Sequence, residues 1–359
     1  MKKLAIVASI LAMVTGTAFA ESSVTLYGTV DVGVTLTKLK SHAATVTMSS
    51  DNWYANKWGI RGTEDLGNGN NIFFNLQAGY NPTNGEARHT GRAFGRESVL
   101  GWKNSNYGTL GLGRMGALSS DVGSYTILGG AAYTTFFSPI GSLYGTFILP
   151  LRINNGVVYV SPEFAGLQAH LMYSNGTNED TEKWSKNDHY YGVGLTYHNA
   201  GFKSNLIWET FDNKAEKPQK ATNLLNFGME YDFGGFTLYG AYQFAQHSQD
   251  LADFISAADV AGLSSLKKGA TQNAFSLSAS AKVAGGTAML QGQYAKGKIK
   301  DNDAKYNVWS VGAAYLYPLS KRTTAYASVG YGQTGESLKR YSESGLYGWT
   351  TTIGMSHNF

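Results

Sequence analysis

Hydrophobic and polar residues alternate with a period of two near the start of this chain. Residues 23 to 37, SVTLYGTVDVGVTLT, place apolar side chains or glycine at the even positions, from Val24 to Leu36, and mostly polar side chains at the odd positions, among them Asp31. Successive side chains of a β-strand point to opposite faces, so the pattern predicts a strand with one apolar and one polar face. The apolar face could contact either a protein core or lipid.

The same alternation recurs to the end of the chain. Examples are HYYGVGLTYH (189 to 198), LLNFGMEY (224 to 231), NAFSLSASAKV (273 to 283) and GWTTTIGMSHNF (348 to 359). Short turns such as LGNGN, NAG and AGG alternate with longer polar segments near 40 to 54, 81 to 92, 174 to 188, 211 to 221, 245 to 271, 297 to 305 and 332 to 345. Short turns at one end and long loops at the other are typical of transmembrane β-barrels, and the count predicts about sixteen antiparallel strands.

Charged residues near the strand centres fall on the polar face. They are Asp31, Arg61, Glu209, Glu230 and Lys282. A basic residue on the lipid face at the middle of the bilayer would cost roughly 2 to 4 kcal/mol, and an acid somewhat less, so a shift of one residue would be unfavourable. The charges therefore favour a lipid-facing apolar surface and a wet interior. A soluble β-sandwich would leave the sorted loop lengths unexplained.

The first 20 residues have the features of a signal peptide. Lys2 and Lys3 precede an apolar run from Leu4 to Gly16, and Ala18-Phe19-Ala20 fits a cleavage site. We therefore expect residues 1–20 to be a signal peptide and residues 21–359 to form a barrel domain. No later apolar run approaches the roughly 20 residues that a transmembrane helix requires.

Composition narrows the function classes. The chain has no cysteine, which excludes disulfides and thiolate metal sites. It has 44 glycines and 23 tyrosines but only 6 prolines, a mixture that favours strands and tight turns. The 29 lysines and arginines, less Lys2 and Lys3, leave 27 against 25 acidic residues, so nothing indicates nucleic acid as a partner.

Motifs that could carry chemistry are weak. Residues 111–116, GLGRMG, fit G-x-G-x-x-G, but a dinucleotide site needs a helix after the motif, and the following segment is too rich in glycine. These glycines are better interpreted as narrow strand positions where the chain bends inward. The seven histidines show no paired ligand spacing, and G-x-S-x-G is absent. We expect no enzyme activity, no metal and no cofactor.

The stretch between Arg114 and Arg152 has an unusual composition. It contains no lysine or arginine, one acid, Asp121, and many glycine, tyrosine and phenylalanine residues. A structureless connection of that length is usually functional, and this one is too apolar for an exposed loop. Its composition therefore marks it as a candidate functional loop.

Several segments together resemble the general diffusion porins of Gram-negative bacteria, of the neisserial and betaproteobacterial type. They are SSVTLYGTVDVGV, KWGIRGTEDLGNG, YGTLGLGRM, LRINNGVVYVSPEF, YPLSKRTTAYASVGY and the terminal IGMSHNF. The resemblance covers the whole chain in order. It implies a sixteen-stranded barrel in the outer membrane, surrounded by its lipid, assembled as a homotrimer and passing ions and small hydrophilic solutes by passive diffusion.

The resemblance also implies roles for particular residues. The third loop, about residues 116–149, would fold into the lumen as a constriction, carrying Asp121, Tyr125, Tyr133 and Tyr144. A basic column on the opposite wall would comprise Lys57, Arg61, Arg96, Arg114 and Arg152. The terminal Phe359 would be read by the barrel-assembly machinery. A ring of charge in a pore concentrates counter-ions, and the surplus of base over acid favours weak anion selectivity.

The sequence departs from the family pattern in two ways. Val158 and Val160 are apolar where relatives often carry charge, and Asp121 is the only acid of the loop. Three alternatives stay open. First, some of the arginines could form structural salt bridges with Asp31, Glu64 or Glu97. Second, the protein could be a sugar-specific channel whose loop tyrosines stack on its substrate, and third, it could be a barrel enzyme or adhesin that uses loop residues such as His89 and Asp188.

Overall fold

The computed structural model describes residues 23–40, 42–120, 122–128, 145–150, 152–177, 183–212, 220–248, 268–301, 303–334 and 347–359. These residues form the following strands: β1 (Ser23–Leu39), β2 (Thr45–Ser50), β3 (Lys57–Gly67), β4 (Asn70–Gly79), β5 (Glu97–Asn104), β6 (Gly108–Gly116), β7 (Arg152–Val160), β8 (Leu167–Asn175), β9 (His189–Asn199), β10 (Phe202–Asp212), β11 (Thr222–Asp232), β12 (Phe236–Ser248), β13 (Ala270–Val283), β14 (Gly286–Ile299), β15 (Lys305–Pro318), β16 (Thr323–Thr334) and β17 (Tyr347–Asn358). A short 3-10 helix, η2 (Trp184–Lys186), precedes β9. No helix among these residues is long and apolar enough to span a bilayer.

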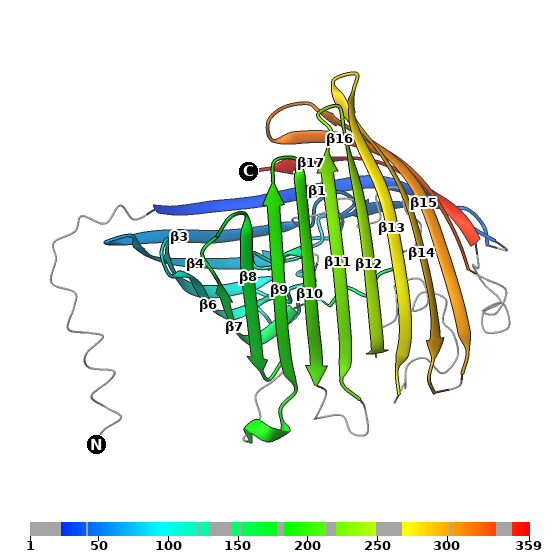
Figure 1. Ribbon diagram of the computed structural model, residues 1–359. Helices are drawn as coiled ribbons and strands as arrows, with labels where there is room; N and C mark the ends of the chain where they lie inside the picture. Colours follow the sequence, from blue (N-terminus) through cyan, green and yellow to red (C-terminus); the bar gives the residue numbers. More distant parts are fainter. Residues whose placement is uncertain are drawn as a thin grey trace, which may run out of the picture.

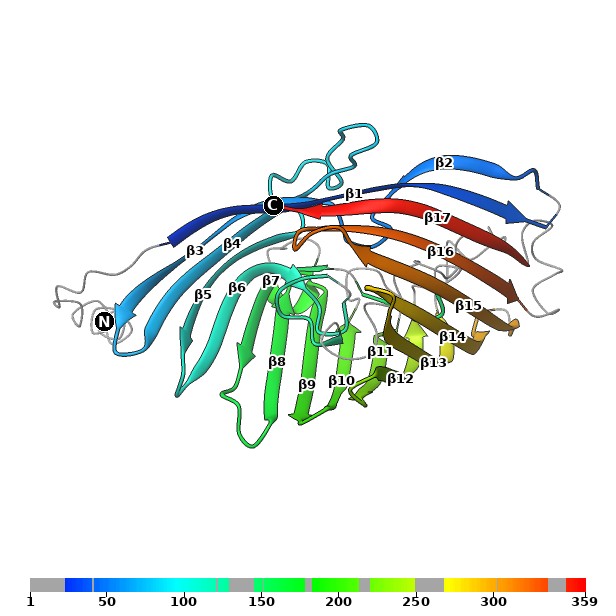
Figure 2. The same ribbon diagram turned by 90° about the horizontal axis from the view of Figure 1, so that it is seen from above.

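The strands form one closed antiparallel barrel. From β3 to β17 each strand pairs with the next along the chain, and β1 pairs with β17 on one side. On its other side β1 pairs with β3 through residues 23–29 and with β2 through residues 32–37, so β2 and β3 share one position in the ring. The barrel therefore has sixteen positions, which confirms the predicted fold. Figures 1 and 2 show β17 lying beside β1 where the ring closes.

The last residue takes part in this closure. The backbone nitrogens of Gly28 and Phe359 each donate to the other's carbonyl oxygen at 3.1 Å. The Phe359 ring lies over Gly28, because a Cβ atom added there would be 2.2 Å from Cζ of the ring. A glycine on β1 is thus covered by the aromatic side chain of the chain's end, and the two termini of the barrel are held together.

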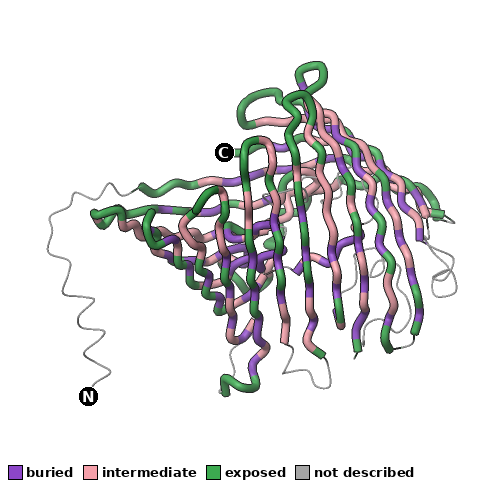
Figure 3. The backbone as a smooth tube through the Cα atoms, in the orientation of Figure 1, coloured by how far each residue is buried: buried purple, intermediate pink, exposed green. Residues whose placement is uncertain are grey.

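The two faces of the wall have the predicted polarity. Large apolar side chains at Val24, Leu26 and Ile353 are 61–70% exposed on the outer face, whereas Asp31 and Glu209 are fully buried on the inner side. Figure 3 shows this alternation of exposed and buried positions along strand after strand. Soluble monomers rarely expose so much contiguous apolar surface, so the outer face is suited to lipid.

Short turns and long connections lie at opposite ends of the barrel. The turn between β3 and β4 has Asn68 and Gly69 with φ of 53° and 76°, the left-handed values that two-residue hairpin turns require. One predicted loop is wrong in part: residues 40–54 contain the strand β2, followed by a segment, residues 51–56, that leaves the wall before β3 begins.

A bulge interrupts the wall where β6 pairs with β7. The register shifts between Gly113 and Met115, and Asn155 opposite has a φ of 52°. Gly113 has a φ of 137°, and a Cβ atom there would lie 2.0 Å from the carbonyl oxygen of Ser98. Only glycine fits this position, which agrees with the interpretation of GLGRMG as a bend rather than a nucleotide site.

Candidate functional site

The connection between β6 and β7 is the third long loop of the barrel, and its first part is held against the inner wall. The backbone nitrogen of Leu118 donates to Oη of Tyr190 at 3.0 Å, and that of Ser119 donates to Oε1 of Glu209 at 3.1 Å. Tyr190 Oη in turn donates to Glu209 Oε1 at 2.5 Å. Tyr190 and Glu209, on β9 and β10, are completely buried and so attach the loop to the wall.

The last part of the loop attaches to a different part of the wall. Three glutamines, Gln243 on β12, Gln272 on β13 and Gln293 on β14, bond to its backbone. Gln243 accepts from the nitrogen of Ile148 at 2.8 Å and donates to the carbonyl oxygen of the same residue at 2.7 Å. Gln272 donates to the carbonyl oxygen of Thr146 at 2.8 Å, and Gln293 accepts from the nitrogen of that residue at 3.2 Å. The two described ends of the loop therefore bond to separate parts of the inner wall.

The underside of the loop is apolar and packs on apolar wall positions. Leu118 and Ile127 belong to the same buried cluster as Val158 and Met172, which lie on β7 and β8. Val158 is 0% exposed. This packing explains why an inward-facing position of β7 carries valine rather than a charge: the loop covers it.

The tyrosine and acid positions predicted for the constriction have different outcomes. Tyr125 lies in the inward loop, but it is only 8% exposed, with its ring against Gly111. Tyr125 also lines a cavity together with Arg61 and Glu97, and its role in the constriction stays a prediction. Asp121, Tyr133 and Tyr144 lie outside the described residues, so their roles stay predictions.

Three of the five basic residues predicted for the pore wall, Lys57, Arg96 and Arg152, lie close together where β3, β5 and β7 begin. The side chain of Arg96 donates from Nε to Oε1 of Gln77 at 2.7 Å, and that of Arg152 donates from Nε to the carbonyl oxygen of Arg96 at 2.8 Å. Lys57 lies on the inner face of β3, opposite Gly79. The Arg96 side chain passes over Gly79, which places its stem beside Lys57.

Arg114 joins this group from β6. Its Nε donates to the carbonyl oxygen of Gly95 at 2.9 Å, and its Nη1 donates to Oδ1 of Asn154 at 2.6 Å. Arg92 reaches the same asparagine oxygen at 3.5 Å. Arg114 therefore links the loop between β4 and β5 to the start of β7.

His89 lies in that loop, and the positive charge around it lowers its pKa. Burial, followed by the charges of Arg152, Arg114, Arg96 and Arg88, lowers the pKa of His89 from 6.5 to about 4. We call Lys57, Arg88, Arg92, Arg96, Arg114 and Arg152 the basic cluster. Among the described residues, two acids lie near it. Asp51 forms an ion pair with Arg88, and the oxygens of Glu97 accept from the backbone and the hydroxyl of Ser124.

Arg61 stands apart from the basic cluster. It lies four residues beyond Lys57 on the same face of β3, and its guanidinium is 5.0 Å from the centre of the Tyr27 ring. Arg61, Glu97 and Tyr125 line a cavity of about 400 Å³. The predicted single column is therefore divided into a cluster and one separate arginine.

A second inward segment was not predicted from the sequence. The carboxylate of Asp31 accepts hydrogen bonds from the backbone nitrogens of Asn52, Trp53 and Tyr54 at 2.9, 3.2 and 3.1 Å. It also accepts from Tyr326 Oη at 2.8 Å. Asp31 is thus a structural cap for residues 51–56. Its position on the wet face was visible in the sequence, but its partners more than 20 residues away were not.

Trp53 extends this segment across the lumen. Its ring packs against Met289, Leu316 and Tyr326, which face inward from β14, β15 and β16. A cavity of about 540 Å³ lies between Trp53 and this wall. The lumen is therefore narrowed by two elements, the loop after β6 and residues 51–56.

Among the residues that the structure describes, no group of three or more metal-ligating side chains comes together. The inner surface instead offers buried amides, hydroxyls and the basic cluster. Such an arrangement defines a water-filled channel through a transmembrane β-barrel.

Comparison with known proteins agrees with this class. The chain belongs to the Gram-negative porin family, which matches residues 7–337. It is 27% identical to an outer membrane porin protein of Bordetella pertussis over all of both chains, and 28% identical to outer membrane porin protein 32 of Delftia acidovorans over 92% of this chain and 89% of that one. An anion-selective porin from Comamonas acidovorans superposes with a TM-score of 0.69 at 23% identity, covering 94% of this chain and all of the other. The protein is an outer-membrane porin, as its sequence predicted.

Proposed function

We propose that this porin passes small hydrophilic solutes and ions by passive diffusion with a preference for anions, and performs no chemistry. The observation that carries the proposal is the basic cluster. Arg92, Arg96 and Arg114 bond to neutral oxygens of Asn154, Gln77 and Gly95. The six cations of the cluster outnumber the two described acids beside them, Asp51 and Glu97. A net positive charge in a pore with low-dielectric walls concentrates anions.

The low pKa of His89 supports this sign of the potential. Nearby positive charge disfavours a further proton, and four arginines contribute to the shift after burial. The anion selectivity of the Comamonas porin is consistent with the same preference here.

We further propose that residues 1–20 direct export and are removed, that the chain functions as a homotrimer, and that Phe359 is read by the barrel-assembly machinery. The contacts of Phe359 with Gly28 support a role for the last residue in closing the ring.

The reversal potential of a planar bilayer in a salt gradient tests the selectivity. Wild-type protein should give the sign of an anion-preferring pore, and Lys57→Gln combined with Arg152→Gln should shift the potential toward cations. The matched control is Lys321→Gln combined with Arg322→Gln, which removes the same charge from the exposed turn between β15 and β16. A reversal potential that the wall variants leave unchanged would contradict the role of the cluster.

Arg61→Gln separates the lone arginine from the basic cluster. A shift toward cations equal to that of the double variant would show that Arg61 also acts on the permeating ion. The absence of any steady conductance from the wild-type protein would contradict the channel itself, and block by one sugar would favour a substrate-specific channel.

A further inference from the structure

Two aromatic side chains of the inward segment, residues 51–56, stand in the lumen near the short turns. Trp53 is partly buried and Tyr54 is 43% exposed, and their ring centroids lie 5.4 Å apart at an interplanar angle of 63°. Asp232 and Gly234, at the turn between β11 and β12, line the same cavity of about 540 Å³ as these two rings. The cavity therefore lies at the end of the barrel that carries the short turns.

Hydrogen bonds fix the backbone that carries these rings. Besides the three bonds to the carboxylate of Asp31, Nδ2 of Asn52 donates to Oη of Tyr326 at 3.0 Å. At the end of the segment, Nδ2 of Asn56 donates to the carbonyl oxygen of Asp31 at 3.0 Å, and Oδ1 of Asn56 accepts from the backbone nitrogen of Asp31 at 2.6 Å. The rings are thus held in place before a solute arrives, which lowers the entropy cost of binding.

The polar atoms of both rings are available to a ligand. Trp53 packs against Met289, Leu316 and Tyr326, so the orientation of its ring is fixed. Within the described part of the chain, neither Nε1 of Trp53 nor Oη of Tyr54 has a hydrogen-bond partner. An indole N–H only donates, whereas a phenol hydroxyl both donates and accepts. A polar solute in the cavity can therefore bond to both groups.

The wall across the cavity adds hydroxyl groups and two opposite charges. Oη of Tyr239 and Oγ of Ser280 lie 3.1 Å apart on β12 and β13, and Nζ of Lys282 donates to Oγ1 of Thr287 at 2.9 Å. All four side chains line the cavity, together with Asp232. Among the described residues that line it, Lys282 and Asp232 carry the only charges, so the lining has no net charge. The cavity therefore suits an uncharged solute with several hydroxyl groups.

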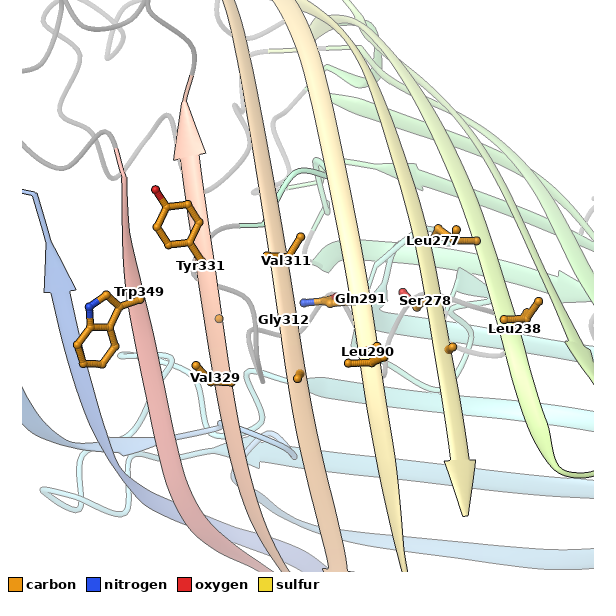
Figure 4. A pocket seen from close by; sticks show the side chains of 13 residues that line it. Leu238, Leu277, Ser278, Leu290, Gln291, Val311, Gly312, Val329, Tyr331 and Trp349 are labelled. Atoms are coloured by element: carbon orange, nitrogen blue, oxygen red, sulfur yellow. The ribbon is translucent and has the colours of Figure 1, made fainter. Parts of the chain in front are cut away.

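A hollow of similar volume on the outer face of the wall has a different lining. Figure 4 shows Leu238, Leu277, Leu290 and Val311 around this hollow, and these side chains are 39–68% exposed. These aliphatic side chains offer no hydrogen bonds, as the lipid-facing side of a barrel requires. The inner cavity instead combines aromatic rings with a few polar groups, which is the usual lining of a site for a small polar ligand.

A pyranose ring matches the lining of the inner cavity. Its C–H groups form an apolar face that can pack against an aromatic ring, while its hydroxyl groups donate and accept hydrogen bonds. The volume of about 540 Å³ falls within the range of about 300–1,000 Å³ that is typical of small-molecule sites. An uncharged sugar gains nothing from the charge of the basic cluster, so the two regions would act on different solutes.

We propose that the cavity between residues 53–54 and the inner wall of β12 to β16 is a binding site for pyranose sugars. The rings of Trp53 and Tyr54 bind the apolar face of the sugar, and the polar groups of β12 to β14 bind its hydroxyl groups. The site recognises the pyranose ring rather than one particular sugar, which is compatible with a general diffusion channel. The inference rests on the proposed channel function, which the current in the absence of sugar tests by itself.

The ion current through single pores in a planar bilayer, with sugar added on the short-turn side, tests the site. Glucose and mannose should lower the current saturably, at half-blocking concentrations within about threefold of each other. Mannitol has the hydroxyl groups without the ring, and should lower the current only as it lowers the conductivity of the bulk solution. Trp53→Ala should raise the half-blocking concentration about tenfold, as expected for truncation of an aromatic anchor. Trp184→Ala, which removes an exposed tryptophan from η2, should leave it within about twofold of wild type.

Ser280→Leu narrows the cavity from the opposite wall and should weaken the block while residues 51–56 keep their contacts. Equal half-blocking concentrations in wild type, Trp53→Ala and Ser280→Leu would overturn the proposal, and so would equal effects of glucose and mannitol. Block by glucose 6-phosphate that is the same in wild type and Trp53→Ala, with no block by glucose, would place solute binding at the basic cluster instead. A normal current that no sugar blocks would contradict the site and leave the channel function intact.

Discussion

The attachment of the third loop to the wall can be tested at a single oxygen atom. Tyr190 Oη accepts from the nitrogen of Leu118 and donates to Glu209, and all three groups are buried. The substitution Tyr190→Phe removes this oxygen and keeps the ring. The centre of the Tyr190 ring lies 4.8 Å from that of Phe211, so a phenylalanine at position 190 keeps the apolar contacts of the site.

The magnitude follows from the two bonds that are lost. A hydrogen bond to a carboxyl group contributes about 1.5–3 kcal/mol when charged, and a buried N–H left without an acceptor costs about 1–3 kcal/mol. Water that enters the site would recover part of this. We therefore expect the docking of residues 117–120 to weaken by at least 2 kcal/mol, which is about thirtyfold in the equilibrium constant.

Hydrogen exchange of the detergent-solubilised protein measures this change, since amides of a docked segment exchange through local opening. The amides of Leu118, Ser119 and Ile127, the last of which donates to the Leu118 carbonyl oxygen, should exchange at least thirtyfold faster in Tyr190→Phe. Tyr294→Phe, the same change on the lipid-facing side, should leave these rates within twofold of wild type. A rise of less than threefold in Tyr190→Phe would refute the reasoning, because the oxygen would then contribute almost nothing to the attachment.

Three further outcomes follow from the structure. Gly28→Val should displace the Phe359 ring, because a Cβ atom would lie 2.2 Å from it, and should therefore lower the yield of heat-resistant barrel on refolding. Gly235→Val, in a turn with open space around it, should leave this yield unchanged. Asp31→Asn should lower the thermal midpoint measured by circular dichroism by about 2–4 kcal/mol of stability, because the bonds to residues 52–54 use both carboxylate oxygens. Asp232→Asn removes the same charge but keeps an oxygen that can accept the single exposed turn bond from Gly234, so it should have a much smaller effect. The pKa of His89 is near 4 in the folded protein and near 6.5 in the unfolded chain, so the unfolded chain binds the proton first as the pH falls. The contribution of His89 to stability should therefore be complete above pH 6.5, decline between pH 6.5 and 4, and change no further below pH 4. His89→Asn should remove this dependence from the thermal midpoints. An unchanged difference between His89→Asn and wild type across this range would contradict that assignment.

The register of the barrel was predictable because one face of the wall contacts lipid and the other contacts water or the polar interior. Val24 and Leu26 face outward while Asp31 faces inward, as their parity in the sequence requires. In a strand the side chains alternate with a period of two, so a register shift of one residue would move every side chain to the opposite face of the wall. The closure between β1 and β17 followed from the same pattern, because an unpaired strand edge is not tolerated in lipid.

The course of residues 40–54 was not predictable in the same way. The strand β2 is only six residues long and contributes just two apolar side chains, Val46 and Met48, to the outer face. The inward turn of residues 51–56 depends on a carboxylate supplied by β1 and on a surface supplied by β14 to β16. Such tertiary contacts leave no periodic signal in the segment itself.

The directions of the basic side chains were also beyond the sequence pattern. Arg114 and Arg152 flank the bulge between β6 and β7, where the register shifts and parity no longer assigns a face. Their contacts with Gly95 and Arg96 come from a loop that has no alternation. The resemblance implied a basic column on the wall, whereas the division into a cluster and a separate Arg61 depends on tertiary contacts that the sequence pattern does not contain.

The two sides of the lumen differ in the kind of polar group they present, and this difference connects the fold with the proposed selectivity. The wall of β12 to β14 presents glutamines, whose amides donate and accept, and so can bond to both backbone groups of a loop residue, as Gln243 does with Ile148. The wall of β3 to β7 presents guanidinium and ammonium groups, which only donate and stay charged. The last part of a loop of nearly neutral composition therefore bonds to the amide side, and the proposed anion preference rests on the cations of the other side.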